Sequence, residues 1–180
     1  MKSPSDSVNI KEAIMDKITK IKQKYIFKNQ ITKQNAEILF QQKSQPTRAY
    51  RGIAIPQNNY KLGDIITVGH EPLPVASWST KYEIAEGFSQ LGTAHMMGKV
   101  SIIFDAIIEG CSFEDCYKEH PTWDEHEIIT PSQQQYQIID ITKKHLPIGE
   151  EEMFCVKRLF PNKEIPTQIP YYIIKLEEVK

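Results

Sequence analysis

Two glutamates lie two residues apart in the stretch Asp124-Glu125-His126-Glu127, directly before the aliphatic and β-branched residues 128–130. In an extended segment, residues i and i+2 point the same way, so Glu125 and Glu127 are expected to share one face. Two carboxylates at the start of a strand are usually a solvated end. They carry chemistry only where a site shifts or uses their charge, so their meaning depends on two earlier stretches.

The first of these stretches places an arginine on a predicted strand. Residues Thr47 to Ile55 are expected to be extended, with Arg51 on the same face as Ala49 and Ile53, and to stop before Pro56. Burying an unpaired guanidinium is costly, so Arg51 must meet a carboxylate, a backbone cluster or an anionic ligand. An internal ion pair is the purely structural alternative.

The second stretch, Ser77-Trp78-Ser79, ends a predicted strand and precedes a predicted helix. Thr80 and Glu83 have the spacing of a capping box, a hydroxyl at the N-cap and a carboxylate three residues on, so the helix should begin there. Ala85 and Phe88 then lie three residues apart on its buried side. Serine is common at such junctions, so this motif alone is weak evidence of a site.

Two helices are predicted ahead of these stretches. Apolar residues recur at three- and four-residue steps, which is the period of an amphipathic helix: Ile10, Ala13, Ile14, Ile18, Ile21 and Tyr25. Lysines fill most other positions, which indicates a solvated face or, less commonly, a grip on an acidic partner. A second helix is expected from Thr32 to Gln42, with Thr32 or Asn29 as its cap. We expect residues 1–45 to form an N-terminal helical layer and residues 46–180 one compact core.

The remaining chain alternates short strands with connecting segments. Further strands are expected over residues 64–69, 73–78, 99–108, 128–130, 136–142 and 171–176. Residues 89–98, with glycines near both ends, are expected to be a loop, and residues 109–127 an acidic loop, while 153–160 is unassigned. Several short strands with helices segregated from them predict an α+β fold, not a regular βαβ repeat.

The composition is that of a globular protein, with 40% hydrophobic residues, 25% charged residues and a formal net charge of −1 over 180 residues. This near-neutral charge argues against wholesale binding of nucleic acid or membranes. No apolar run is long enough to span a bilayer, and the N-terminus lacks the apolar core of a signal peptide. Three cysteines do not make a disulfide framework. We therefore expect a cytoplasmic protein.

The arginine, the serines and the glutamates stand in the order of a known signature. Arg51-Gly52, Ser77-x-Ser79 and Glu125-x-Glu127 resemble the Arg, Ser-x-Ser and Glu-x-Glu motifs of the mono-ADP-ribosyltransferases of the arginine-modifying toxin and phage type. Ala85 and Phe88 follow the serines at the distances typical of that family. Each motif is weak, but three in order at suitable spacing make a specific pattern.

The residues around these motifs extend the resemblance, which covers about residues 47–176. The second glutamate is followed by aliphatic and β-branched residues and then Pro131, as is common in the family. Trp78 departs from the usual Thr between the serines, at a position that varies among members. The N-terminal helices would correspond to a helical layer that many members carry, although no motif there supports the match.

The resemblance implies a β-sandwich of two small sheets around an NAD cleft. It also implies that ADP-ribose is transferred from NAD, as substrate, to an arginine of a target protein, with release of nicotinamide. Glu127 would stabilise the oxocarbenium-like charge that develops on the ribose, and Ser77 would orient it with Ser79 in support. Arg51 would hold the NAD pyrophosphate, because a planar fork suits phosphate oxygens.

The resemblance assigns further residues to NAD and to its acceptor. Gly52 would let the backbone approach the nicotinamide amide, and the loop that includes Gly92 would close over NAD. Phe88 is expected in the core, with a place against the nicotinamide as its cofactor-binding alternative. Glu125 would hold the acceptor guanidinium and ease its deprotonation, since Glu here accompanies arginine acceptors in the family. The expected partners are NAD and a target protein in the cytoplasm of the producing cell or of a target cell; neither membrane nor nucleic acid is expected.

Four alternatives stay open at this point. One is a zinc site from Cys111, Cys116, His120 and His126, whose middle spacing is shorter than in common zinc fingers. Another is an inactive binding module that keeps the fold and contacts a partner through its lysine-rich helix. The third is an ADP-ribosyltransferase whose acceptor is a nucleic acid or another side chain. Cys-His nucleophilic catalysis has the least support, because no cysteine has a recognisable local signature.

Overall fold

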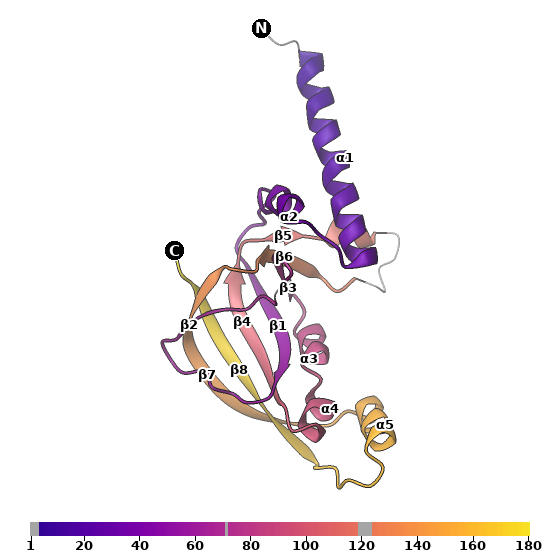
Figure 1. Cartoon of the computed structure of the whole chain (residues 1–180), viewed down its shortest axis with the longest axis vertical. Helices are drawn as coiled ribbons and strands as arrows, with labels where there is room; N and C mark the ends of the chain where they lie inside the picture. The colour runs from indigo at the N-terminus through magenta and orange to yellow at the C-terminus, as the bar shows by residue number, and fades with distance from the viewer. Residues whose placement is uncertain (1–3, 71, 119–123) are drawn as a thin grey trace.

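The computed structural model describes residues 4–70, 72–118 and 124–180. Two helices, α1 (Pro4–Lys28) and α2 (Lys33–Phe40), come first, and strands dominate the rest. Figure 1 shows α1 projecting from one end of a curved sheet, with α3, α4 and α5 along one side of it. The helices after α2 are α3 (Tyr82–Ser89), α4 (Leu91–Met96), the 3-10 turn η1 (Glu114–Tyr117) and α5 (Glu150–Leu159).

The described strands form one hydrogen-bonded sheet in the order β2-β7-β8-β4-β1-β3-β6-β5. Their bounds are β1 (Thr47–Ile55), β2 (Ile65–Thr67), β3 (Val75–Ser79), β4 (Val100–Ile108), β5 (Cys111–Ser112), β6 (Glu127–Pro131), β7 (Gln135–Pro147) and β8 (Gln168–Glu178). The predicted α+β class is confirmed. The two predicted small sheets are groups of strands joined at a single register position, where Tyr50 of β1 lies opposite Ser79 of β3.

The main core lies between the larger group of strands and the β3–β6 pair. Trp78, Phe104 and Tyr136 are its largest buried side chains, and Ala49 and Ile53 of β1 pack into it, as the alternation of β1 predicted. Trp78 also donates from its indole nitrogen to the Thr130 hydroxyl (3.0 Å). Because alternate residues of β3 face opposite sides, burying Trp78 turns Ser77 and Ser79 away from this core.

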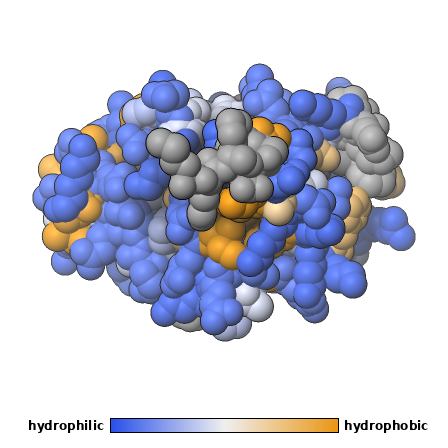
Figure 2. Space-filling model, turned by 90° about the horizontal axis from the view of Figure 1, so that it is seen from above, coloured by the Kyte–Doolittle hydropathy of each residue, from blue (hydrophilic) through white to orange (hydrophobic). Residues whose placement is uncertain are grey.

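Helix α1 is only partly packed on the rest of the molecule. Ile18, Ile21 and Tyr25 are buried against α2 and the β5–β6 region, as predicted. Ile10 and Ile14, predicted on the same buried face, are about half exposed, because α1 extends beyond the elements that could cover them. Figure 2, seen from above relative to Figure 1, shows hydrophobic patches on a largely hydrophilic surface.

One lysine of α1 does not belong to the predicted solvated face. Lys22 is buried and donates to the Ser112 carbonyl (2.8 Å) and to the Asp115 carboxylate (3.0 Å). Its ammonium group also lies 5.5 Å from the centre of the Phe113 ring. These contacts fix the C-terminal half of α1 on the segment that follows β4.

The cap and bounds of α2 and the strand bounds of β1 agree with the sequence. Thr32 is the N-cap of α2 and accepts from the Asn35 backbone N–H (3.1 Å). Both helices end before the predicted boundary at residues 45 and 46, and β1 begins after it at Thr47. The division into a helical layer and a core remains a prediction.

Two local predictions between β3 and β4 are wrong. Helix α3 begins at Tyr82, with Lys81 and not Thr80 as its N-cap and no side-chain cap, while the Thr80 backbone N–H donates to the His126 carbonyl (3.0 Å). The predicted loop over residues 89–98 contains α4, whose Leu91 and Ala94 are buried. A left-handed Gln90 (φ 53°) separates α3 from α4; Gly92 lies within α4, and Gly98 (φ 74°) lies in the turn after it.

The unassigned segment near residues 153–160 is helical, as α5. Among the described residues, no helix combines the length and apolar character needed to cross a membrane. Within the same ranges, no group of three His, Cys, Asp or Glu side chains could hold a metal ion. His120 of the alternative zinc site lies outside the described residues.

Candidate functional site

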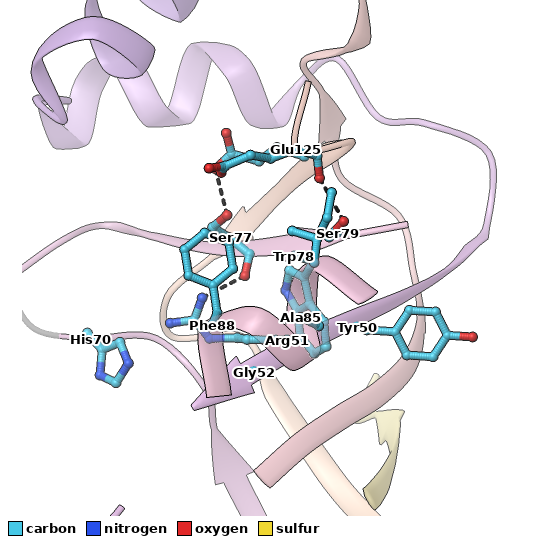
Figure 3. A pocket seen from close by; sticks show the side chains of 12 residues that line it. Tyr50, Arg51, Gly52, His70, Ser77, Trp78, Ser79, Ala85, Phe88 and Glu125 are labelled. Atoms are coloured by element: carbon cyan, nitrogen blue, oxygen red, sulfur yellow. Dashed lines mark hydrogen bonds between the residues drawn. The ribbon is translucent and has the colours of Figure 1, made fainter. Parts of the chain in front are cut away.

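All three sequence motifs meet at one cavity of about 210 Å³ between β1, β3, α3 and the start of β6. Figure 3 shows Glu125 on one side of it and Arg51 on the other, with Ser77 between them. The lining comprises the three motifs and their neighbours: Tyr50, Arg51, Gly52, His70, Ser77, Trp78, Ser79, Ile84, Ala85, Phe88, Glu125 and Glu127. The residues of the three predicted motifs therefore lie together in the fold, although they come from distant parts of the chain.

Glu127 is the buried carboxylate of the site, with 6% of its surface exposed. The Ser77 hydroxyl donates to its Oε1 at 2.6 Å, and the Tyr25 hydroxyl donates to the same atom at 3.3 Å. Burial raises the pKa of Glu127 above its usual range, while the hydrogen bonds from Ser77 and Tyr25 and the charge of Arg51 oppose that rise. The side chain is therefore held in one position with its charge partly destabilised.

Glu125 differs from Glu127 in both backbone and exposure. The prediction that residues 125–127 are extended is wrong, because His126 has a left-handed conformation (φ 50°) and β6 begins at Glu127. The Asp124 carboxylate stabilises this turn by accepting from the His126 backbone N–H (2.7 Å). Glu125 is exposed, and both glutamates still line the cavity because the turn, not strand alternation, directs Glu125 toward it.

The two serines of β3 each hold one of the two glutamates. Ser77 binds the Glu127 side chain, whereas the Ser79 hydroxyl donates to the Glu125 backbone carbonyl (2.7 Å) and accepts from the Lys81 backbone N–H (3.1 Å). Ser79 therefore positions the turn, and its predicted support of Glu127 is indirect. In the antiparallel pair of β3 and β6, Ser79 lies opposite Glu127 and Ser77 opposite Ile129, so the Ser77 hydroxyl reaches the Glu127 side chain from the neighbouring register position.

Arg51 finds the backbone cluster that its buried position requires. Its Nε donates to the Val68 carbonyl (2.9 Å) and its Nη1 to the Ser77 carbonyl (2.6 Å). Burial lowers the pKa of Arg51, and the charge of Glu127 counters that effect. Among the described residues, no carboxylate forms an ion pair with Arg51, in contrast to Arg48 on the same strand, which holds Asp105 at 2.8 Å.

The glycine after Arg51 has a structural reason in addition to its predicted one. A Cβ at Gly52 would lie 1.7 Å from the Ala85 carbonyl oxygen, so only glycine lets α3 pack this closely on β1. This contact sets the distance between α3 and β1 at the cavity. An approach of the Gly52 backbone to nicotinamide remains a prediction.

Two predicted site residues lie elsewhere than the sequence suggested. Phe88 is not in the core, because it is 56% exposed and lines the cavity; α3 buries Ala85 instead. Gly92 is not among the residues that line the cavity. It is buried in α4, where a Cβ would lie 2.9 Å from the Glu152 carboxylate, and its backbone N–H donates to that carboxylate. Gly92 therefore fits the packing of α4 on α5.

Tyr25 is a residue of the site that the sequence did not reveal. Its position in an apolar period of α1 predicts a core residue, and it is buried, with its ring 5.5 Å from that of Phe113. Its hydroxyl nevertheless reaches Glu127 from a helix 102 residues earlier in the chain. Burial, followed by the charge of Glu127, raises the pKa of Tyr25, so the group is a neutral donor. No local signal distinguishes such a tyrosine from an ordinary core residue.

Comparison with solved structures gives the fold a name. Vis toxin, an ADP-ribosyltransferase from Vibrio splendidus, matches with a TM-score of 0.53 over 99% of this chain and 87% of its own, at 14% identity. Its complex with the M6 inhibitor matches with a TM-score of 0.58 over 99% and 86%, at 13% identity. The fold is that of an ADP-ribosyltransferase. A third match, Vis in complex with agmatine, has a TM-score of 0.52 over 100% and 87%, at 14% identity.

The sequence itself matches no family model and no curated protein. At identities this low, the comparison concerns the arrangement of the elements and not the side chains. The chemistry of this chain therefore depends on the residues that line its own cavity.

Proposed function

We propose that the protein transfers ADP-ribose from NAD to the guanidino group of arginine, with release of nicotinamide. The observation that carries this proposal is the meeting of Arg51, Ser77, Glu125 and Glu127 at one cavity of an ADP-ribosyltransferase fold. An arginine and two carboxylates with different surroundings suit a substrate whose phosphates are anionic and whose reacting ribose becomes cationic.

NAD would enter as a substrate with its reacting end in the cavity. Ligand pockets commonly measure roughly 300–1,000 Å³, so a cavity of about 210 Å³ suits one end of the dinucleotide. The free donors of Arg51 would bind the pyrophosphate, since its two hydrogen bonds to carbonyls leave part of the guanidinium available. Phe88, exposed at the cavity, would offer its ring to the nicotinamide.

Glu127 would act on the bond between ribose and nicotinamide. As that bond breaks, nicotinamide leaves with the electron pair and positive charge develops on the ribose. A carboxylate fixed by Ser77 and Tyr25 and partly desolvated stabilises this charge without having to reorganise. Its raised pKa is the consequence of the same burial.

Glu125 would act on the acceptor. A guanidinium arrives charged, and its nitrogen must lose a proton as it bonds to the ribose carbon. An exposed carboxylate at the same cavity can bind the guanidinium and pass the released proton to solvent. The binding of agmatine by Vis, a protein of the same fold, is consistent with a guanidinium acceptor. Water in place of the acceptor would give NAD hydrolysis as a side activity.

The test is incubation of the purified protein with labelled NAD and a cell lysate, followed by mass spectrometry of the labelled proteins. The proposal expects ADP-ribose on arginine side chains, and no label with Glu127→Gln. Label on another side chain or on nucleic acid would contradict the arginine part of the proposal. Absence of both label and nicotinamide release would contradict the whole of it and favour an inactive binding module.

A further inference from the structure

A second cavity of about 470 Å³ adjoins the first on the side of α1. The two cavities share Ser77, Phe88 and both glutamates of the site. The second cavity is completed by the C-terminal end of α1, from Tyr25 to Phe27, by Asn29, and by Tyr117 of η1. Glu125 and Glu127 therefore stand between two spaces, of which only the first has been given an occupant.

The walls of the second cavity are aromatic and acidic. Tyr25 and Tyr117 line it as buried rings, whereas Phe27 and Phe88 are 69% and 56% exposed. No lysine, arginine or histidine is among the described residues that line it. Aromatic faces beside a carboxylate attract organic cations, and guanidinium in particular, because its planar group stacks on rings and pairs with carboxylates.

The charges of the two cavities assign their occupants. Arg51 and His70 line the first cavity but not the second. The phosphates of NAD are therefore attracted to the first cavity by Arg51, whereas the described lining of the second cavity offers them no cation beside the two carboxylates that both cavities share. A cationic acceptor has the opposite preference, and it would meet the reacting ribose where the cavities share Glu125 and Glu127.

We propose that the second cavity is the acceptor subsite, which receives a guanidinium on an alkyl chain with Phe27, Phe88 and Tyr117 as aromatic walls and Glu125 as counter-charge. This inference rests on the proposed function and adds the residues that select the acceptor. It gives the end of α1 a direct part in substrate binding. Asn29 fixes that end, because its left-handed conformation (φ 48°) stops the helix and its backbone N–H donates to the Tyr25 carbonyl (2.8 Å).

The probe is agmatine, an alkylguanidine, and the variants are Phe27→Ala, Phe27→Tyr and Phe154→Ala. Phe154 is the matched control, since it is also 69% exposed but lies on α5, away from the site. Calorimetry measures agmatine binding without NAD, and initial rates measure transfer to agmatine and NAD hydrolysis. Loss of one aromatic wall is expected to raise the dissociation constant of agmatine and its KM about three- to tenfold. The KM for NAD is expected to change less.

The expected pattern is weaker agmatine binding by Phe27→Ala, near-parental binding by Phe27→Tyr and no change in Phe154→Ala. The subsite is overturned if the parent does not bind agmatine, if Phe27→Ala binds it as tightly as the parent, or if Phe27→Ala raises the KM for NAD as much as that for agmatine. A parent that binds agmatine but neither hydrolyses NAD nor transfers ADP-ribose would support the cation subsite and contradict the proposed function.

Discussion

Glu127 and Glu125 are two residues apart, yet they belong to regions of opposite character. Glu127 is the first residue of a buried strand and accepts hydrogen bonds from Ser77 and Tyr25, which come from two other elements. Glu125 precedes a left-handed turn, is exposed, and is fixed through its backbone by Ser79. A fixed, desolvated carboxylate suits a charge that develops at one place, whereas an exposed one suits a group that arrives and leaves.

The largest expected effect on activity comes from a substitution in the buried region, at Glu127. Glu127→Gln keeps the shape and removes the charge, so NAD hydrolysis and ADP-ribose transfer should both fall by about 10²–10³-fold in rate assays. Burial raises the pKa of Glu127 in the folded state. In the interval between the unfolded and folded pKa values the unfolded chain binds fewer protons, so ionised Glu127 disfavours folding as pH rises. The variant should therefore unfold at an equal or higher temperature than the parent at neutral pH.

A Glu127→Gln protein that is folded and as active as the parent would contradict the role of the buried carboxylate. If the variant is inactive and also unfolds at a lower temperature, destabilisation could account for the loss of activity. Ser77→Ala is therefore the second variant. It removes the 2.6 Å hydrogen bond while leaving the carboxylate in place. It is expected to lower both activities about tenfold, with Glu127 free to move.

The next effect concerns the anion-binding side of the site. Arg51→Lys retains the charge but not the planar fork, and it should raise the KM for NAD about tenfold in steady-state assays. Arg48→Lys is the matched control, because Arg48 lies on the same strand and holds Asp105 with two hydrogen bonds. Equal KM values for NAD in the two variants would contradict the assignment of Arg51.

The smallest expected effect comes from removing the Tyr25 hydroxyl, which donates to Glu127. Tyr25→Phe removes one hydrogen bond to the carboxylate and should lower the rate about two- to fivefold. That bond lowers the pKa of Glu127, so its loss raises the pKa, with Ser77, Glu125 and Arg51 unchanged around it. Because the ionised form is required, the acidic limb of the rate profile should move to higher pH. An unchanged pH profile would reduce Tyr25 to a packing residue.

The sequence predicts the buried strands of the site better than the turn that carries Glu125, because strands have a local periodic pattern and this turn has none. The alternation of β1 fixes its bounds and the position of Arg51, and the Ser-x-Ser and Glu-x-Glu spacings predict residues that do meet. The positions of Arg51 in β1 and of the two serines in β3 follow from strand periodicity, which is a local property of the chain. The left-handed turn at His126 has no such signal, so the right pair of glutamates was predicted through the wrong backbone.

The predictions that were wrong or incomplete concern residues whose surroundings depend on tertiary packing. Ile10 and Ile14 continue the apolar period of α1 past the end of the core, and no local pattern tells how far a partner surface extends. Glycines near both ends of residues 89–98 predict a loop that includes Gly92, whereas in the structure Gly92 lets α4 pack on α5. Tyr25 reaches Glu127 only once the C-terminal half of α1 packs against the β5–β6 region, so its role depends on a contact 102 residues away.

The most direct test of the division between the two glutamates is the ratio of transfer to hydrolysis in Glu125→Gln. Nicotinamide release without acceptor and ADP-ribosyl-agmatine formation are measured in parallel for the parent, Glu125→Gln and Glu127→Gln. We predict that Glu125→Gln loses transfer about 10²-fold or more but keeps hydrolysis within about tenfold of the parent, whereas Glu127→Gln loses both. Equal loss of both activities in Glu125→Gln would contradict a separate role for the exposed carboxylate.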